Sequence, residues 1–76
     1  MKTKIDAIEE MIQVVVLAIP KETEAYESYT NAGAKAVSDR SRNLFAVLAA
    51  QEKGHEAELR RILLELKTEL SELRRS

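Results

Sequence analysis

The sequence predicts an all-α protein, an antiparallel hairpin of two helices that occupies residues 1–76 as a single domain. The prediction rests on a composition poor in helix breakers, on two long stripes of residues at helical spacing, and on a short polar segment between them. The chain of 76 residues contains 2 Gly, 1 Pro and no Cys, and 33% of its residues are charged. A chain this short forms one domain, and its many Ala, Leu, Glu, Lys and Arg residues favour helices.

The charge balance and the hydropathy exclude two classes of function. Lys and Arg number 12 and Asp and Glu number 13, so the net charge of -1 lacks the basic field of a nucleic-acid-binding protein. The apolar runs are shorter than the roughly 18 residues of a membrane helix. The run from Met11 to Ile19 follows acidic residues and ends in a poor cleavage sequence, unlike a signal peptide. We expect a cytoplasmic protein that binds neither nucleic acid nor membrane.

The first helix is expected over residues 3–36, because one stripe continues through this segment in steps of three and four residues. The stripe consists of Ile5, Ile8, Ile12, Val15, Ile19, Glu22, Tyr26, Tyr29 and Gly33. Pro20 lies beside the stripe and cannot donate a backbone hydrogen bond, so it should kink or break this helix. Such a kink either faces solvent without further role or adjusts the position of Glu22.

The second helix shows the same spacing. Its stripe consists of Phe45, Leu48, Glu52, His55, Leu59, Ile62 and Leu66, and Leu70 and Leu73 continue it with a drift of one residue. The polar segment 37–43 separates the two stripes, and Ser38 or Asp39 can cap the second helix. Helices joined by so short a link pack antiparallel, with the turn near residue 38.

Three polar residues interrupt these otherwise apolar or aromatic stripes. Glu22 precedes residue 38 by 16 positions, and Glu52 and His55 follow it by 14 and 17. At about 1.5 Å per residue, the three side chains should lie at one level of the hairpin. Each one alone is better explained as a structural or ion-paired residue. Together they indicate a shared cation, since two facing carboxylates repel one another and this ligand set suits iron, manganese or zinc.

Self-association is expected because a two-helix hairpin buries too little surface to be stable alone. Apolar residues that one neighbouring helix cannot cover are Val14, Val16, Leu17, Leu44, Val47, Leu63 and Leu64. Two hairpins around a twofold axis form a four-helix bundle, which would contain the three polar residues twice. Glu24, Glu27, Glu56 and Glu58 are expected to face away from the stripes, and Glu24 and Glu56 could form an outer site through which iron reaches the interior.

These residues resemble the ferritin-like di-iron carboxylate superfamily, in which two helices each carry a Glu and two others each carry Glu-x-x-His. The segment from Glu22 to Tyr29 is similar to the first ligand helix of rubrerythrins, where a Tyr follows a ligand Glu by seven residues. The segment from Leu44 to His55 resembles the second ligand helix. The thirty-residue spacing from Glu22 to Glu52 also resembles encapsulated ferritins, which are half-length ferritins.

The resemblance implies a di-iron centre that oxidises Fe(II) with oxygen or peroxide, as a ferroxidase in iron storage or in defence against oxidative stress. It implies that Glu22 is a terminal or chelating ligand, that Glu52 bridges the two metals, and that His55 is a terminal ligand. Tyr29, and with it Tyr26, would support the ligands from outside, or both would serve only in packing. Ile19, Leu48 and Leu59 would keep the centre dry.

The sequence also departs from these families. Full rubrerythrins have two pairs of ligand helices in one chain and a Cys-containing electron-transfer domain, so a peroxidase built from this chain needs a partner that donates electrons. Encapsulated ferritins usually have a C-terminal targeting tail, whereas Leu73-Arg74-Arg75-Ser76 continues the helical pattern, so an encapsulin compartment is not expected. Two alternatives remain: a structural module that mediates oligomerisation and has no catalytic activity, and the same bundle with manganese or zinc in a role without redox chemistry.

Overall fold

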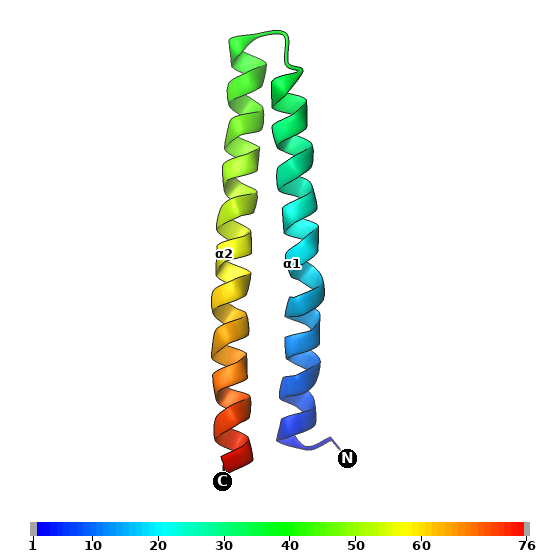
Figure 1. Cartoon of the computed structure of the whole chain (residues 1–76), viewed down its shortest axis with the longest axis vertical. Coiled ribbons are helices and arrows are strands. Elements are labelled where there is room, and N and C mark those ends of the chain that lie inside the picture. The colour runs from blue at the N-terminus through cyan, green and yellow to red at the C-terminus, as the bar shows by residue number, and fades with distance from the viewer. Residues whose placement is uncertain (1, 76) are drawn as a thin grey trace.

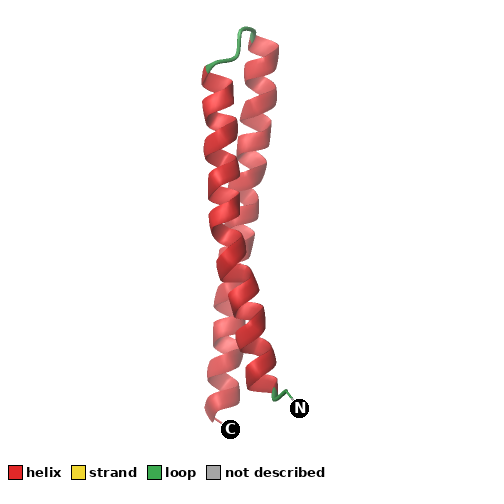
Figure 2. Ribbon diagram, turned by 90° about the vertical axis from the view of Figure 1, so that its right-hand side faces the viewer, coloured by secondary structure: helices red, strands yellow, loops and turns green. Residues whose placement is uncertain are grey.

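The computed structural model describes residues 2–75, which form two α-helices, α1 (Lys4–Ala34) and α2 (Asp39–Arg75). The helices lie side by side and antiparallel, so the two ends of the chain meet at one end of the molecule (Figure 1 and Figure 2). The hairpin is a rod of 58 × 18 × 13 Å. The predicted all-α hairpin is therefore confirmed. Met1 and Ser76, which the expected domain includes, lie outside the described residues.

The start of α1 is fixed by a capping box at Thr3. The Thr3 hydroxyl oxygen accepts a hydrogen bond from the Asp6 backbone N–H at 3.1 Å, and the Asp6 carboxylate accepts one from the Thr3 backbone N–H at 3.4 Å. These contacts satisfy N–H groups that have no partner within the helix. At the other end, the Lys35 N–H donates to the Ala32 carbonyl at 3.2 Å. Both ends of α1 agree closely with the predicted range.

Ser38 caps α2, as one of the two predicted alternatives. Its hydroxyl oxygen accepts from the Ser41 N–H at 3.1 Å, and its carbonyl accepts from the Arg42 N–H at 3.0 Å. Asp39 lies in the first turn, where the N-terminal end of the helix dipole favours a negative charge, and pairs with Arg42 at 2.6 Å. The turn therefore lies where the polar segment predicts it.

Pro20 does not divide the first helix, so the predicted break is wrong. Helix α1 continues through Pro20 without interruption. The proline is exposed, and the residues that pack against α2 before it, Val15 and Ile19, are buried. Packing of this face compensates for the one backbone hydrogen bond that the proline cannot donate to the Val16 carbonyl. A kink that adjusts Glu22 stays a prediction.

The predicted stripe of α1 forms its contact with α2. All nine residues of this stripe are buried or half-buried, and Ile8, Val15, Ile19 and Gly33 are the buried ones. The two backbones come close near the turn. A Cβ atom placed on Gly33 would lie only 3.3 Å from the Cβ of Phe45. A glycine at this position therefore permits the close approach of the helices.

The predicted stripe of α2 is wrong by one residue at two of its nine positions, and its other seven residues are half-buried as predicted. Leu48 is 37% exposed, whereas Ala49 is buried, and His55 is exposed, whereas Glu56 is half-buried. Steps of three and of four residues both fit a helix of 3.6 residues per turn, so the larger Leu48 was the natural choice from sequence. The close approach of the helices near Gly33 favours the smaller alanine instead.

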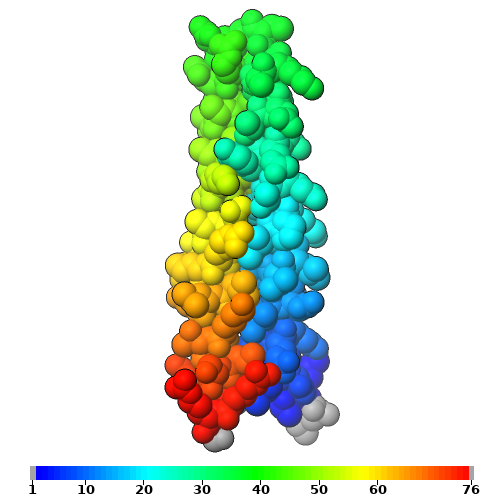
Figure 3. All heavy atoms as spheres, viewed as in Figure 1, coloured from blue at the N-terminus to red at the C-terminus, as the bar shows by residue number. Residues whose placement is uncertain are grey.

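The hairpin leaves much apolar surface uncovered. The side chains of the two helices meet along the length of the rod (Figure 3), yet the buried hydrophobic residues within residues 2–75 are only Ile8, Val15, Ile19 and Ala49. The large hydrophobic residues that remain exposed are Met11, Val14, Val16, Leu17, Val37, Leu44, Val47, Leu48 and Leu64. Leu63, which was expected among them, is half-buried. Within the described chain, neither helix has a stretch long and apolar enough to cross a lipid bilayer.

Candidate metal centre

The structure brings Glu22, Glu52 and His55 together near the middle of the hairpin, as their distances from the turn predict. One potential ligand atom from each residue lies within 4.8 Å of the other two. His55 Nδ1 is 3.5 Å from Glu22 Oε2 and 3.6 Å from Glu52 Oε2. Glu52 and His55 share one face of α2 because they are three residues apart. Helix α1 supplies Glu22 from across the interface.

The three side chains differ in their exposure. The Glu22 and Glu52 side chains are 25% and 17% exposed, whereas the His55 side chain is 61% exposed. The two carboxylates therefore lie between the helices, and the imidazole lies at the solvent-facing edge of the cluster. The cluster opens toward solvent at His55, which is where a further protein ligand would have to approach.

The two carboxylates hold one another in an unfavourable arrangement. The pKa of Glu52 is raised above its ordinary value, first by the facing Glu22 carboxyl group, with which it can share a proton, then by desolvation and by the negative charge of Glu22. His55 opposes this shift. A bound cation would relieve the repulsion without a proton. Two carboxylate oxygens and an imidazole nitrogen fit iron, manganese or zinc, but three side chains do not fill the coordination sphere of an octahedral metal.

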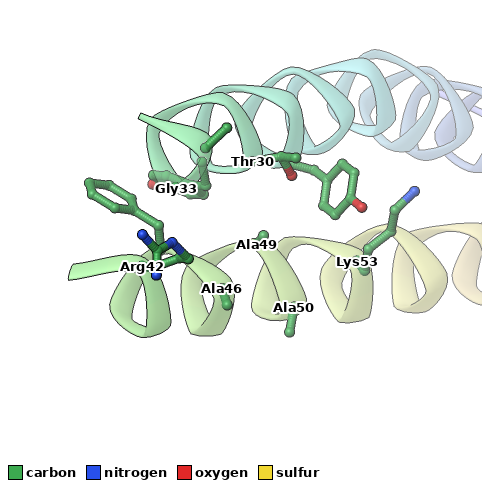
Figure 4. Close-up of a pocket in the computed structure, with 11 residues that line it drawn as sticks. Thr30, Gly33, Arg42, Ala46, Ala49, Ala50 and Lys53 are labelled. Carbon is green, nitrogen blue, oxygen red and sulfur yellow. The ribbon is translucent and has the colours of Figure 1, made fainter. Parts of the chain in front are cut away.

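The two tyrosines lie on the interface side of α1, and both are half-buried. The Lys53 ammonium lies 4.4 Å from the centre of the Tyr26 ring, a cation–π contact. Tyr29 contributes to an apolar groove near the turn, where Thr30 and Gly33 of α1 lie opposite Ala49 of α2 (Figure 4). The part of the chain that the structure describes contains no hydrogen bond from either phenol to a ligand carboxylate, so their supporting role stays a prediction.

Glu24 and Glu56 do not form the expected outward pair. Glu24 is exposed, but the Glu56 side chain is only 17% exposed and accepts a hydrogen bond from the Thr23 hydroxyl at 2.9 Å. The expected outward orientation of Glu56 is therefore wrong, because the side of α2 that faces α1 passes from Glu52 through Glu56, not His55, to Leu59. Arg60 approaches the same carboxylate at 3.6 Å. The Thr23 hydrogen bond is the main cause of a lowered Glu56 pKa, and nearby positive charges contribute.

Sequence reasoning missed Thr23 entirely. Thr23 directly follows Glu22, so it lies at the same level of the hairpin and at the edge of the face that packs against α2. This position was a signal that could have been used. A corrected stripe on α2, with Glu56 in place of His55, would then have predicted the contact. Glu24 is exposed, unlike Glu56, and its role in an outer iron site stays a prediction.

Comparison with known proteins agrees with this geometry. The family model described as Rubrerythrin matches residues 1–63, a range that includes both helices' contributions to the cluster. No curated protein and no solved structure is similar enough to the chain to count as a match. The family match covers most of the 76 residues, and the predicted resemblance of the chain to rubrerythrins is thereby confirmed at the level of the family. The chain belongs to the rubrerythrin family.

Proposed function

We propose that two copies of this chain form a ferritin-like four-helix bundle that holds a di-iron centre and oxidises Fe(II). The observation that carries the proposal is the convergence of Glu22, Glu52 and His55 within 4.8 Å of one another. Proteins of the rubrerythrin family usually bind iron. Iron held by carboxylates changes readily between Fe(II) and Fe(III), so a bound pair can deliver two electrons to oxygen or peroxide.

The number of ligands favours a centre shared between two chains. One hairpin supplies two carboxylates and one imidazole, which is half of the set that ferritin-like bundles use for two metals. A twofold axis beside His55 would double this set. The 61% exposure of the His55 side chain leaves room for such a neighbour. The half-length chain would in this way complete the centre by dimerisation.

The distribution of exposed apolar residues supports the same arrangement. On α2, Leu44 and Leu48 precede His55 by eleven and seven residues and therefore lie on the same face of the helix. On α1, Met11 and Val14 lead through Ala18 to Glu22 in steps of three and four residues. Of these residues, Leu44, Met11 and Val14 are 60%, 51% and 68% exposed. A second copy that covers this face would bury them and enclose both clusters.

Each residue of the cluster has a distinct task in this proposal. The Glu22 and Glu52 carboxylates are hard anionic donors that stabilise Fe(III) more than Fe(II), which favours oxidation. His55 would bind the metal through an imidazole nitrogen, a donor that suits iron, manganese and zinc. Ile19 and Leu59, which are buried and half-buried, limit the access of water from the interior side.

The proposal is tested by anaerobic titration of the metal-free protein with Fe(II), together with its mass in solution. We expect saturable binding near one iron per chain, a dimer or larger oligomer, and Fe(III) absorbance after oxygen is added. Glu52→Ala removes a ligand and should weaken binding by more than about 100-fold, since even groups that only orient a ligand contribute 10- to 100-fold. Glu69→Ala removes an exposed carboxylate of the same helix and should bind as the parent does.

The second candidate is a structural oligomerisation module, which the exposed apolar residues also favour. This alternative predicts that removal of metal leaves the oligomer and its melting temperature unchanged, and that Glu52→Ala is neutral or stabilising. The metal proposal predicts a fall in melting temperature when metal is removed, because a ligand that binds the folded state stabilises it. Absence of saturable Fe(II) binding would refute the metal centre and leave the structural module. Faster turnover with peroxide and an added electron donor than with oxygen would instead indicate a peroxidase.

A further inference from the structure

The cluster depends on the register between α1 and α2. Glu22 lies twelve residues, or about 18 Å, before the end of α1, and the helices are covalently joined only at the turn. The apolar contacts on either side, which include Ile19 toward the chain ends and Ala49 toward the turn, have no directional polar group that sets the relative height of the helices. Glu22 reaches Glu52 and His55 only if the two helices are held at one relative height.

A polar contact outside the ligand cluster joins the helices at this height. The Thr23 hydroxyl donates to Glu56 Oε2 at 2.9 Å. Among residues 2–75, the other polar side-chain pairs between α1 and α2 with a measured separation are longer, at 3.5 Å for His55 with Glu22 and 3.8 Å for Arg74 with Glu9. A directional contact of this kind fixes register more closely than apolar packing does.

The contact joins the residues next to the predicted ligands. Thr23 directly follows Glu22, and Glu56 directly follows His55 and lies one turn after Glu52. The Glu56 side chain is 17% exposed, and Arg60 approaches its other oxygen, Oε1, at 3.6 Å. The carboxylate is thus oriented from both helices, and its acceptor atom is held toward Thr23.

The single hydroxyl proton of Thr23 has two possible acceptors. The Ile19 carbonyl of the same helix lies at 3.4 Å, and the Glu56 carboxylate lies at 2.9 Å. The carboxylate is the nearer acceptor and carries a negative charge, which makes the stronger hydrogen bond. The proton therefore serves the contact between the helices rather than the common bond of a threonine to its own helix.

We propose that Thr23 and Glu56 are positioning residues that hold Glu22 in register with Glu52 and His55. We refer to their hydrogen bond as the interhelical lock. This inference rests on the proposed function, because the lock affects metal binding only if the cluster binds metal. Neither residue needs to touch the metal, because each acts through the ligand that precedes it in the chain.

The test uses Co(II) as the probe, since its visible absorption reports both affinity and coordination. Thr23→Val keeps the shape of the side chain and removes the hydroxyl. We expect about tenfold weaker Co(II) binding, as for other groups that orient a metal ligand, and an altered absorption spectrum. Thr23→Ser retains a hydroxyl and should restore both affinity and spectrum. Thr68→Val is the matched control, because the Thr68 hydroxyl donates only to Leu64 of its own helix, at 2.9 Å.

A second pair of variants separates the lock from effects on folding. Thr23→Ala removes the hydroxyl with a residue that favours helices, and it replaces Thr23→Val if the valine variant fails to fold. In a Glu56→Ala background, the lock is already absent, so either change at Thr23 should cause no further loss of Co(II) affinity. A further tenfold loss in that background would overturn the lock.

The outcomes also distinguish this inference from the proposed function. Parent protein that binds Co(II), with Thr23→Val showing the same affinity and spectrum, overturns the lock and leaves the metal centre intact. Parent protein that binds no metal refutes the centre, and the lock with it. Weaker binding in Thr23→Val together with full recovery in Thr23→Ser supports the lock.

Discussion

The half of the hairpin near the chain ends differs from its middle. Before Pro20, α1 contributes Ile8, Val15 and Ile19, three of the four buried hydrophobic residues of the described chain. The middle instead contains two carboxylates, an imidazole and the interhelical lock. The first region stabilises the pairing of the helices, whereas the second sets their register and provides the chemistry. Stability and function are therefore separated along the rod.

The largest expected effect on stability comes from truncating a buried side chain in the apolar half near the chain ends. Ile8→Ala and Ile19→Ala each remove a buried side chain, and each should lower the free energy of unfolding by about 2–4 kcal/mol. Chemical denaturation of the metal-free protein at fixed protein concentration measures both. Only Ile19→Ala should also weaken Fe(II) binding, because Ile19 lies one turn before Glu22. Equal losses of Fe(II) affinity in the two variants would show that the two regions are not separate.

A smaller effect should appear in the dependence of stability on pH. The pKa of Glu52 is raised in the folded state above its ordinary value of 4.5, so its favourable contribution is present below that value and is lost as pH rises through the raised pKa. The metal-free parent should therefore lose stability relative to Glu52→Gln as pH rises toward neutrality. Denaturation of both proteins with a chelator present, over a range of pH, measures the difference.

Glu56 should show the opposite trend one turn further along α2. Its pKa is lowered in the folded state, mainly by the Thr23 hydroxyl, so its contribution is present above 4.5 and is lost as pH falls through the lowered pKa. Glu56→Gln should thus be less stable than the parent at neutral pH and approach it in acid. If the stability of Glu52→Gln and Glu56→Gln relative to the parent changed with pH in the same direction, the opposite pKa shifts of Glu52 and Glu56 would be contradicted.

The sequence was sufficient for the helices and the convergence of the three ligands, but it was insufficient for the side of α2 that faces α1. Counting from the turn at residue 38 works because the rise of a helix is nearly constant, so height follows from residue number. Rotation is less well determined, since Leu48 and Ala49 both fit the helical period. Glu56 was assigned to the wrong face because His55 and Glu56 fit the period equally well, and its hydrogen bond with Thr23 was missed as a result.

The smallest expected effect compares the two glycines, both of which lie inside helices. Gly54→Ala meets nothing within 4 Å, so the gain in helix propensity should raise the free energy of unfolding by about 0.5–1 kcal/mol. Gly33→Ala has the same gain, but its Cβ would lie 3.3 Å from the Cβ of Phe45, so the helices must separate slightly and the net change should be smaller or unfavourable. Thermal unfolding of the two variants measures the difference. A destabilising Gly54→Ala would show that a second copy packs against this face of α2, which is open in the single hairpin.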